Sequence, residues 1–579
     1  MIFQPTFENG GLPLVEYPRP QMKRNSYFPL NGKWRYAIRK TKETESYDGE
    51  IFVPYSPECS LSGVNRQLKK DEYLFYAKSF TLPENFNRGR VLLNVGACDQ
   101  VCEVFLNGVS VGRHEGGYLP FTLDVTNALQ TGENELTFTV RDDADSDVYG
   151  RGKQRYQRGG IWYTATSGLW QSVWLESVPT SYLKGFRLYP DAEKGTLRIT
   201  FEKTGEIDEI SVEVQEDGKT LAAAKTTGNE VVLDVLGCKQ WTTDDPQLYP
   251  ISIRAGADEI ESYFGLRSFG AKTRGEYRYF TLNGKPIFHN GLLDQGYWKD
   301  GLYTPPSNRA MFDEIKSVKD LGFNMLRKHI KTEPHLWYYY CDILGVLVWQ
   351  DMLNGGAKYK EYRIKLAPFV DLHIDDKNYK GMGRSEQSRK WYYEEAYGLI
   401  DALFNCVSLC LWTPFNEAWG QFDAKEVCEK LQAYDPTRLY DHASGWQDKG
   451  GGDVRSRHIY FRKLRAKNDR KRVLAVTEFG GYSYPFAGHT FTEKIFGYKL
   501  FKDGAKFANA LEKLYDTEVI PLIRQEGLCG TVYTQLTDIE DEINGLFTYD
   551  RVLKTDAVRV QKMNERLYEA FEKEVVETL

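Results

Sequence analysis

Two glutamates in the carboxyl-terminal half of the sequence follow apolar runs that have the composition of buried strands. The run 407–412 leads into Asn416-Glu417, and the run 473–477 leads into Glu478. If both runs are strands of one parallel barrel, both carboxylates emerge at its carboxyl-terminal rim, where barrel active sites lie. Such a pair can hydrolyse a glycoside, because one carboxyl group protonates the leaving oxygen while the other attacks or activates water.

The positions of these glutamates also allow a purely structural explanation. The dipeptide Asn-Glu occurs four times, at 134–135, 229–230, 416–417 and 564–565, so it carries little information by itself. Only Asn416-Glu417 follows a buried-strand pattern and is flanked by tryptophans, Trp412 and Trp419. For Glu478 a structural salt bridge explains the position equally well, and on the residues alone both interpretations stay open.

A (β/α)8 TIM barrel is the arrangement that would position both glutamates. From residue 280 onward, short apolar runs alternate with helical periodicity, as in the apolar face formed by Met311, Ile315 and Val318. Their number, and a length of about 300 residues, match a TIM barrel. The eight runs that qualify as strands are 286–289, 323–327, 346–349, 407–412, 439–442, 458–461, 473–477 and 530–533.

The first half of the chain predicts β-structure without a convincing helix. Residues 101–111 have the pattern of two strands joined by Asn107-Gly108, the sequence of a tight hairpin turn. Farther along, apolar and polar residues alternate at 210–214, and further short strands follow at the spacing of a β-sandwich. The sequence therefore predicts three domains, at 1–179, 180–272 and 273–579.

Composition argues against several kinds of partner. The net charge of -6 and the isoelectric point of 5.9 give no electrostatic reason to expect nucleic acid. The longest apolar stretch, 399–415, is interrupted by Asp401 and Asn405, so no membrane span is expected. Nine cysteines without a C-x-x-C pair, and a start without a signal sequence, favour the cytoplasm. The eight histidines show no metal-binding spacing, so neither a metal nor another cofactor is expected.

Eight short motifs occur in one order along the chain. They are PLNGKW at 29–34, GGIW at 159–162, SGLWQ at 167–171, LDQGYW at 293–298, RKH at 327–329, WTPFNEAWG at 412–420, ASGW at 443–446 and TEFG at 477–480. With them the sequence resembles glycoside hydrolase family 2, the β-galactosidase and β-glucuronidase family, over essentially its whole length. The resemblance implies an N-terminal jelly-roll sugar-binding-like domain, an immunoglobulin-like β-sandwich and a catalytic TIM barrel.

The same resemblance implies the catalytic residues. It places the acid/base at Glu417 and the nucleophile at Glu478. Arg327 and Tyr460 correspond to residues that support the nucleophile, and Asn416 to the asparagine that holds the sugar 2-hydroxyl. These roles are physically consistent, because the nucleophile must stay ionised, which Arg and Tyr donors favour, whereas the acid must keep its proton near neutral pH.

Four further residues are implied as substrate-binding. Asp294 and His329 fall where relatives line the subsite for the terminal sugar. Trp446 is a candidate for stacking on the sugar, with packing in the barrel wall as an equal alternative. Gln535, or its neighbour Thr534, takes the place of a tryptophan that many relatives carry at the start of the last loop.

Departures from the family pattern bear on the substrate. The loop 534–545 lacks the Asn-x-Lys motif with which glucuronidases bind the sugar carboxylate, and its four carboxylates, at Asp538, Glu540, Asp541 and Glu542, would repel a uronate. The stretch before Glu417 does not reproduce the magnesium site of large β-galactosidases. We therefore expect a retaining exo-glycosidase that removes a neutral terminal sugar, most simply β-galactose, from an oligosaccharide or other glycoside.

Other functions stay open on the sequence alone. Within the same family they are β-glucuronidase, β-galactofuranosidase and α-L-arabinofuranosidase activity. A non-catalytic carbohydrate-binding protein is the alternative from another class; loss of a catalytic carboxylate would be its sign, and both glutamates are present. A homo-oligomer is compatible with every one of these functions.

Overall fold

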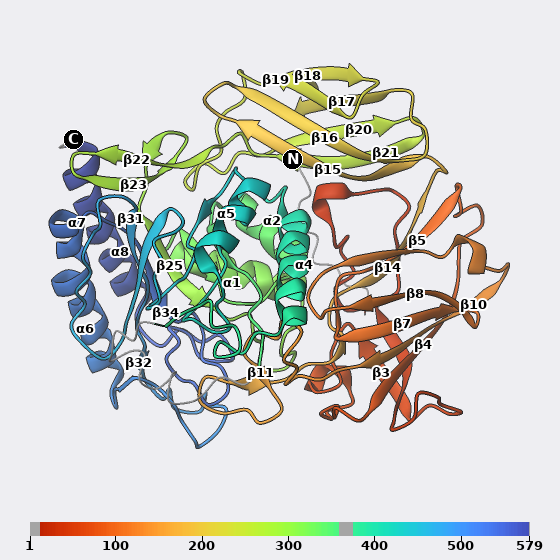
Figure 1. Ribbon diagram of the computed structural model, residues 1–579, viewed down its shortest axis with the longest axis horizontal. Coiled ribbons are helices and arrows are strands. Elements are labelled where there is room, and N and C mark those ends of the chain that lie inside the picture. Colours follow the sequence, from red (N-terminus) through yellow and green to blue (C-terminus); the bar gives the residue numbers. More distant parts are fainter. Residues whose placement is uncertain (1–11, 358–373, 578–579) are drawn as a thin grey trace.

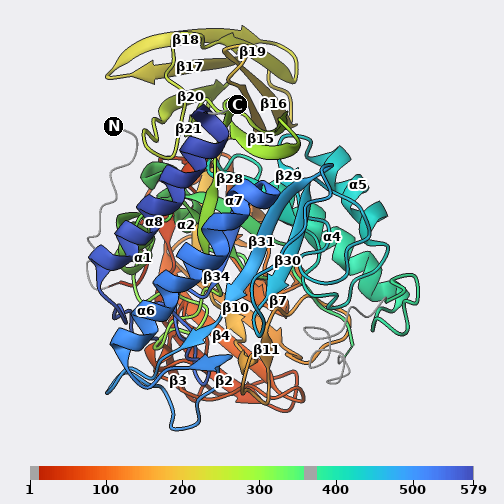
Figure 2. The same ribbon diagram turned by 90° about the vertical axis from the view of Figure 1, so that its left-hand side faces the viewer.

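Strands dominate the first half of the chain and alternate with helices in the second (Figures 1 and 2). The structure is a computed structural model that describes residues 12–357 and 374–577. In Figure 1 the first β-sandwich lies to the right of the barrel and the second lies above it. No helix within the described ranges is long and apolar enough to cross a membrane.

The first β-sandwich packs a six-stranded sheet on a four-stranded sheet. Alternation of buried and exposed positions along β10 gives each sheet one apolar face. Buried residues of both sheets, among them Trp34, Leu93 and Leu175, form one core. The six-stranded sheet runs β3 (Gly49–Val53), β2 (Gly32–Arg39), β4 (Tyr73–Thr81), β10 (Glu133–Arg141), β7 (Val101–Leu106), β8 (Val109–Glu115), and the other β1 (Phe28–Pro29), β14 (Val173–Val178), β5 (Arg90–Val95), β9 (Phe121–Asp124).

The second β-sandwich is smaller and forms by the same alternation. Its core contains Ile199, Val212 and Ile251, which come from three different strands. One sheet runs β15 (Tyr182–Asp191), β16 (Thr196–Thr204), β19 (Glu230–Asp234), and the other β18 (Lys219–Thr226), β17 (Ile210–Glu216), β20 (Tyr249–Ala255), β21 (Asp258–Phe264). A three-stranded sheet of β22 (Phe269–Arg274), β23 (Tyr277–Leu282) and β24 (Lys285–Pro286) then leads into the barrel.

Eight parallel strands form the barrel, as the sequence predicts. Their order leaves β29 and β30 at the two ends of the sheet, so the barrel is nearly closed within the described residues. Almost every strand position is buried, which explains the continuous apolar runs. The strands are β25 (His289–Asp294), β26 (Met325–Lys328), β27 (Leu347–Asp351), β28 (Leu409–Thr413), β29 (Leu439–Tyr440), β30 (Val454–Ile459), β31 (Val473–Gly480) and β34 (Leu528–Thr534).

Helices cover the barrel on its outer side. The first of them begins where the Ser307 side chain accepts a hydrogen bond from the Ala310 N–H, and it buries Met311, Ile315 and Val318, the face expected from the sequence. The helices of the described barrel are α1 (Asn308–Asp320), α2 (His335–Leu344), α4 (Glu386–Leu403), α5 (Ala424–Tyr434), α6 (Gly504–Leu514), α7 (Ile520–Glu526) and α8 (Ala557–Phe571).

Two barrel strands differ in position from the sequence prediction. The first begins at His289 rather than at Pro286, because Pro286 pairs with β23 in the sheet before the barrel. The sixth is β30, which ends near where the predicted strand 458–461 begins. Its first residues include Arg455, Ser456 and Arg457, so the strand lacks the apolar run by which its neighbours are identified.

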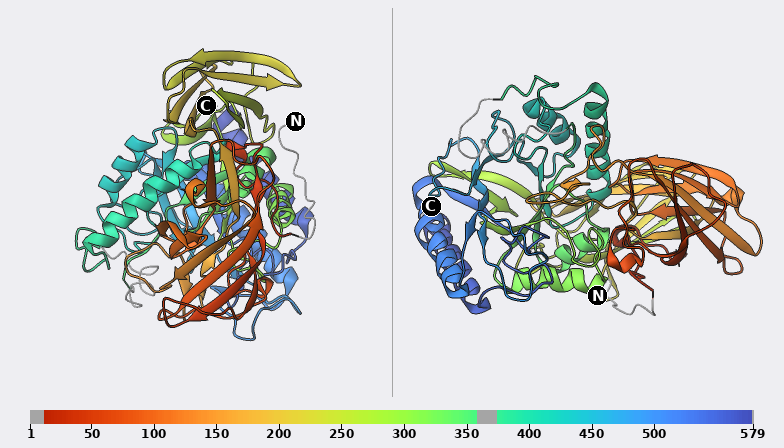
Figure 3. Two further views of the ribbon diagram at one scale, coloured as in Figure 1. Left: turned by 90° about the vertical axis from the view of Figure 1, so that its right-hand side faces the viewer. Right: turned by 90° about the horizontal axis from the view of Figure 1, so that it is seen from below.

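A loop of the first sandwich reaches the last loop of the barrel. It contains β11 (Gln154–Arg155) and β12 (Tyr163–Thr164), which pair with each other, and Figure 1 places β11 at the lower edge of the barrel. Arg158 pairs with Asp541, and the Tyr163 hydroxyl donates to Glu542. Figure 3 shows the first sandwich extending away from the barrel. Two further short pairs are β6 (Cys98–Asp99) with β13 (Gly168–Leu169), and β32 (Tyr482–Ser483) with β33 (Lys499–Leu500).

Candidate active site

The two glutamates of the sequence analysis meet at one end of the barrel. Glu417 lies in the loop after β28, where its N–H donates to the Ser444 carbonyl at 2.8 Å. Glu478 lies near the carboxyl end of β31, two residues before the strand ends and not after it as expected. One oxygen of each glutamate and a ring nitrogen of His458 all lie within 4.8 Å of one another. Carboxyl groups this close suit a retaining double displacement, since inverting enzymes keep them about 6.5–9.5 Å apart.

His458 lies between the glutamates and was not among the residues expected from the sequence. Its Nδ1 is 2.9 Å from Glu417 Oε1 and 3.4 Å from Glu478 Oε2. Its Nε2 is 3.1 Å from Ser444 Oγ, and the Ser444 hydroxyl itself donates to Thr477 Oγ1 at 2.8 Å. In the tautomer in which Nε2–H donates to Ser444 Oγ, Nδ1 is an acceptor that faces Glu417 and can accept a hydrogen bond from its carboxylic acid. Arg327 Nη1, which can only donate, lies 3.5 Å from the same Nε2.

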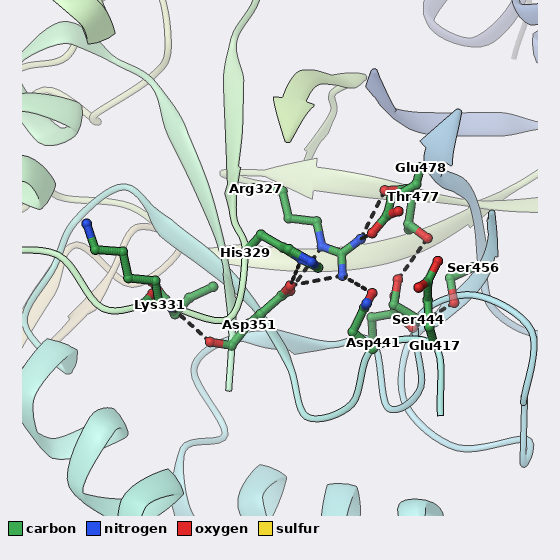
Figure 4. A network of polar contacts seen from close by, with 12 residues as sticks. Arg327, His329, Lys331, Asp351, Glu417, Asp441, Ser444, Ser456, Thr477 and Glu478 are labelled. Carbon is green, nitrogen blue, oxygen red and sulfur yellow. Dashed lines mark hydrogen bonds and ion pairs between the residues drawn. The ribbon is translucent and has the colours of Figure 1, made fainter. Parts of the chain in front are cut away.

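Arg327 connects the residues around the nucleophile. Its fully buried guanidinium donates to Glu478 Oε1 at 3.1 Å and to Asn416 Oδ1 at 2.9 Å. Two further hydrogen bonds of 3.0 Å go to Asp351, which also lies 2.7 Å from His329 Nδ1 (Figure 4). Asp351 therefore fixes the plane of the guanidinium, and the guanidinium in turn orients Glu478 and Asn416.

Tyr460 supplies the second donor to Glu478. Its hydroxyl donates to Glu478 Oε2 and lies 3.1 Å from Thr534 Oγ1. The ring stacks on Tyr498 with centroids 4.3 Å apart, which holds the hydroxyl in place. Each oxygen of Glu478 thus receives one donor, an arrangement that favours its ionised form.

The two carboxyl groups differ in what surrounds them. Burial raises the pKa of Glu417 to about 7, so that this group retains its proton near neutral pH. Burial also raises the pKa of Glu478, but the carboxylate of Glu478, unlike that of Glu417, accepts hydrogen bonds from Arg327 and Tyr460. Separate environments of this kind assign an acid and a nucleophile to a pair of carboxyl groups.

The remaining expected site residues lie at different distances from the glutamates. Trp446 is half-buried; its Nε1 donates to the His458 carbonyl at 3.2 Å, and its ring meets the His458 ring edge to face at 5.6 Å. Gln535 is fully buried, accepts from Gln295 at 2.9 Å and donates to Asn544 at 2.8 Å. None of these contacts reaches Glu417 or Glu478.

Asp294 is directed away from the pair. It is level with Lys328 in the paired strands β25 and β26, and its carboxylate lies 2.5 Å from Lys328 Nζ. Because side chains alternate along a strand, Lys328 and Asp294 point to the face opposite that of Arg327. The structure therefore places Asp294 in a buried ion pair on the face of the barrel sheet opposite that of Arg327.

The four carboxylates of the acidic loop after β34 all have hydrogen-bond or ion-pair partners. Asp538 pairs with Lys554 at 2.6 Å, and Asp541 with Arg158 at 2.9 Å. Glu540 accepts the Thr164 N–H at 3.2 Å, and Glu542 accepts Asn544 Nδ2 at 2.9 Å as well as the Tyr163 hydroxyl. Lys554 and Arg158 therefore offset part of the negative charge of this loop, whereas Glu542, whose hydrogen-bond donors are neutral, keeps its charge.

The same centre has the donor types of a metal site. Glu417, His458 and Glu478 each offer one ligand atom, and these are residue types that bind divalent transition metals. A cation held there would occupy both carboxylates and so block proton transfer and attack. The residues present therefore fit a metal as an inhibitor of the carboxylate pair, and the expectation of a metal-independent protein stays a prediction.

Comparisons with known proteins point to one family. Residues 59–161 match the family model described as glycosyl hydrolase 2 galactose-binding domain-like, and residues 275–471 match the one described as glycosyl hydrolases family 2, TIM barrel domain. A putative β-glucuronidase of Formosa agariphila is 26% identical over 274 residues, which are 44% of this chain and 32% of that protein. A β-galactosidase of Thermoanaerobacter pseudethanolicus is 22% identical over 79% of this chain and 61% of its own length. The chain thus spans between a third and two thirds of these relatives.

A solved structure agrees over nearly the whole chain. A β-glucuronidase from an uncultured Clostridium sp. superposes with a TM-score of 0.73, covering 94% of this chain and 99% of that one at 17% identity. At this identity the likeness concerns the fold alone. The order of two sandwiches and a barrel is common to both chains.

Proposed function

Because this chain belongs to glycoside hydrolase family 2, we propose that it hydrolyses a terminal glycosidic bond with retention of anomeric configuration. Glu478 serves as the nucleophile and Glu417 as the acid/base. The observation that carries the proposal is the approach of their oxygens to within 4.8 Å, with His458 between them. An approach of this kind suits a covalent intermediate, whereas inverting enzymes keep their carboxyl groups about 6.5–9.5 Å apart to admit a water.

The reaction proceeds in two displacements. Glu478 attacks the anomeric carbon while Glu417 gives its proton to the departing oxygen, which yields a glycosyl ester of Glu478 and the free aglycone. Glu417, now a carboxylate, takes a proton from water, and the resulting hydroxide attacks the anomeric carbon and releases Glu478. His458 Nδ1 orients the acid before transfer, and Arg327 and Tyr460 stabilise the Glu478 carboxylate as it leaves.

Asn416 is available to hold the sugar. Its Oδ1 accepts from Arg327, and its Nδ2 is buried without a hydrogen-bond partner among the residues that the structure describes. A buried donor of this kind normally has a partner. We assign the sugar 2-hydroxyl to it, in keeping with the role that the family resemblance implies.

A panel of 4-nitrophenyl glycosides tests the proposal. The β-galactoside, β-glucuronide, β-galactofuranoside and α-L-arabinofuranoside are compared by nitrophenolate release, because relatives are named both β-galactosidase and β-glucuronidase. We expect cleavage of at least one, with NMR showing that the first sugar released has the anomeric configuration of the substrate. An inverted product contradicts the mechanism. Binding of sugars without cleavage of any substrate indicates a carbohydrate-binding protein instead.

The rate should depend on pH through Glu417. Its raised pKa of about 7 means that the proton needed by the leaving group is lost above that pH. We expect kcat/KM to fall about tenfold per pH unit on the alkaline side, since this parameter reports ionisation of the free enzyme. In Glu417→Gln, measured on an activated aryl glycoside, the alkaline limb should disappear. An unchanged limb in that variant would assign the titration to another group.

A further inference from the structure

Lys153 is a buried lysine next to the catalytic centre. It precedes β11 in the loop of the first sandwich, and the residue is 7% exposed. Its Nζ lies 5.6 Å from the centre of the Trp419 ring and 5.8 Å from that of the Tyr163 ring. Within residues 12–357 and 374–577, no ion pair or hydrogen bond engages this ammonium group.

The other buried lysines of the described chain behave differently. Lys328 lies 2.5 Å from Asp294, Lys331 lies 2.8 Å from Glu333, and Lys554 lies 2.6 Å from Asp538. Each of the three therefore has a carboxylate that compensates the loss of water around its charge. Contacts with aromatic faces compensate only part of that loss, so Lys153 alone retains the capacity to bind an anion.

The charge of Lys153 acts on the catalytic residues. Burial is the main influence on the pKa of Glu417 and on that of Glu478, and in both cases the Lys153 ammonium opposes the rise. Trp419, which Lys153 faces, is two residues beyond Glu417, and its ring lies 6.5 Å from that of His329. A sugar seated between the glutamates is thus within the reach of this cation.

Nearby acidic residues already have other partners. The Tyr163 hydroxyl donates to Glu542, whose second oxygen accepts from Asn544. Arg158, on the same loop as Lys153, forms an ion pair with Asp541. Within the described residues, no carboxylate of the last barrel loop forms an ion pair with Lys153.

We propose that Lys153 binds an anionic group carried on the terminal sugar, so that the substrates are acidic glycosides. The inference rests on the proposed function and names its substrate class. Two sources offer the same chemistry, the carboxylate of a uronic acid and a sulfate ester on a neutral sugar. Either would form a charge-assisted hydrogen bond with Nζ in a site from which water is largely excluded.

The test compares variants of Lys153 on matched substrates. Lys153→Met keeps the length and the apolar contacts with both rings, and Lys153→Arg keeps the charge. Arg155→Met is the control, because Arg155 lies on the same loop and pairs with Asp145 at 3.2 Å. The substrates are 4-nitrophenyl β-glucuronide and β-galacturonide, the corresponding β-glucoside and β-galactoside, and the 6-sulfated β-galactoside.

We expect the wild type to prefer an acidic substrate, and Lys153→Met to lower kcat/KM on it by about 100-fold or more. The neutral counterpart should change by less than about threefold, and Lys153→Arg should retain part of the preference. A loss on the uronide alone assigns a carboxylate, and a loss on the sulfated sugar alone assigns a sulfate. Equal loss on acidic and neutral substrates, or a wild-type preference for the neutral ones, overturns the proposal.

A binding measurement separates this inference from the proposed activity. Calorimetry with free glucuronate and galacturonate, against glucose and galactose, needs no turnover. Tighter binding of the acids by the wild type, weakened by salt and lost in Lys153→Met, supports the anion site even if no glycoside is cleaved. Thermal melting confirms that the variants are folded. If neutral glycosides are cleaved and the free uronates bind no more tightly than the neutral sugars, the proposed function holds and the inference about Lys153 is wrong.

Discussion

Glu478→Ala is expected to lose turnover on every glycoside, including aryl glycosides whose leaving group needs no proton. Without the carboxylate, no covalent glycosyl-enzyme forms, and the first displacement stops whatever the aglycone. By analogy with other enzymes that lose their nucleophile, the loss should be about six orders of magnitude in kcat. It is measured with a 2,4-dinitrophenyl glycoside of the sugar that the wild type prefers.

Glu478→Gln serves as the companion variant, because its amide still accepts hydrogen bonds from Arg327 and Tyr460. It should melt like the wild type and bind the product sugar while remaining inactive. Azide added to Glu478→Ala should yield a glycosyl azide of inverted configuration. Activity of either variant within tenfold of the wild type would remove Glu478 from the role of nucleophile.

Glu417→Ala should show a loss that depends on the leaving group. General acid catalysis contributes about 10²–10⁴-fold, and most of it is needed only when the departing oxygen is basic. We therefore expect a large fall of kcat/KM on alkyl glycosides and a small one on the 2,4-dinitrophenyl glycoside. Azide should accelerate turnover of that substrate by intercepting the intermediate, and the glycosyl azide should retain the anomeric configuration.

A matched control for this variant is Glu230→Ala. Glu230 also follows an asparagine, but it is exposed on β19 of the second sandwich, where it pairs with Arg198. It should keep wild-type kinetics on all substrates. If azide rescues Glu478→Ala with retention and Glu417→Ala with inversion, the two glutamates exchange roles. The retaining class would still hold in that case.

Much of the fold and the central pair followed from the sequence for a simple reason. Buried parallel strands are continuous apolar runs, and a barrel directs the ends of those runs to one rim, so Glu417 and Glu478 had to meet if the runs were strands. The resemblance to a family supplied their order as acid and nucleophile. Neither the apolar runs nor the resemblance predicts the side-chain contacts that decide the protonation of Glu417 and Glu478.

His458 was missed because β30 lacks an apolar run. The polar residues of its first half hid the strand, and the predicted segment began at His458 instead of ending near it. The period of two along a strand carried the missing signal, since Ser456, His458 and Tyr460 alternate and Tyr460 was already assigned to the site. The same rule applied to the paired strands β25 and β26 directs Asp294 away from Arg327.

The acidic loop shows a limit of another kind. Its four carboxylates are evident in the sequence, but the partners that engage them come from distant segments, as with Arg158 and Asp541, which lie 383 residues apart. The charge of a loop follows from its composition, whereas the field it produces depends on the cations that fold against it. Lys153 could not be identified from the sequence for the same reason, because only the folded chain shows that no ion pair or hydrogen bond engages its ammonium group within the described residues.

The contact between the first sandwich and the barrel matters for the design of chimeras between proteins of this architecture. Arg158, Tyr163 and Thr164 belong to one structural module, and the carboxylates that they engage belong to another. If this barrel were joined to a foreign sandwich, Glu540, Asp541 and Glu542 would lose these donors. The unit of contacts is therefore a pair of loops, 150–164 and 534–545, carried by two separate modules. Chimeras that exchange both loops together keep that unit intact, whereas those cut at the module boundary divide it.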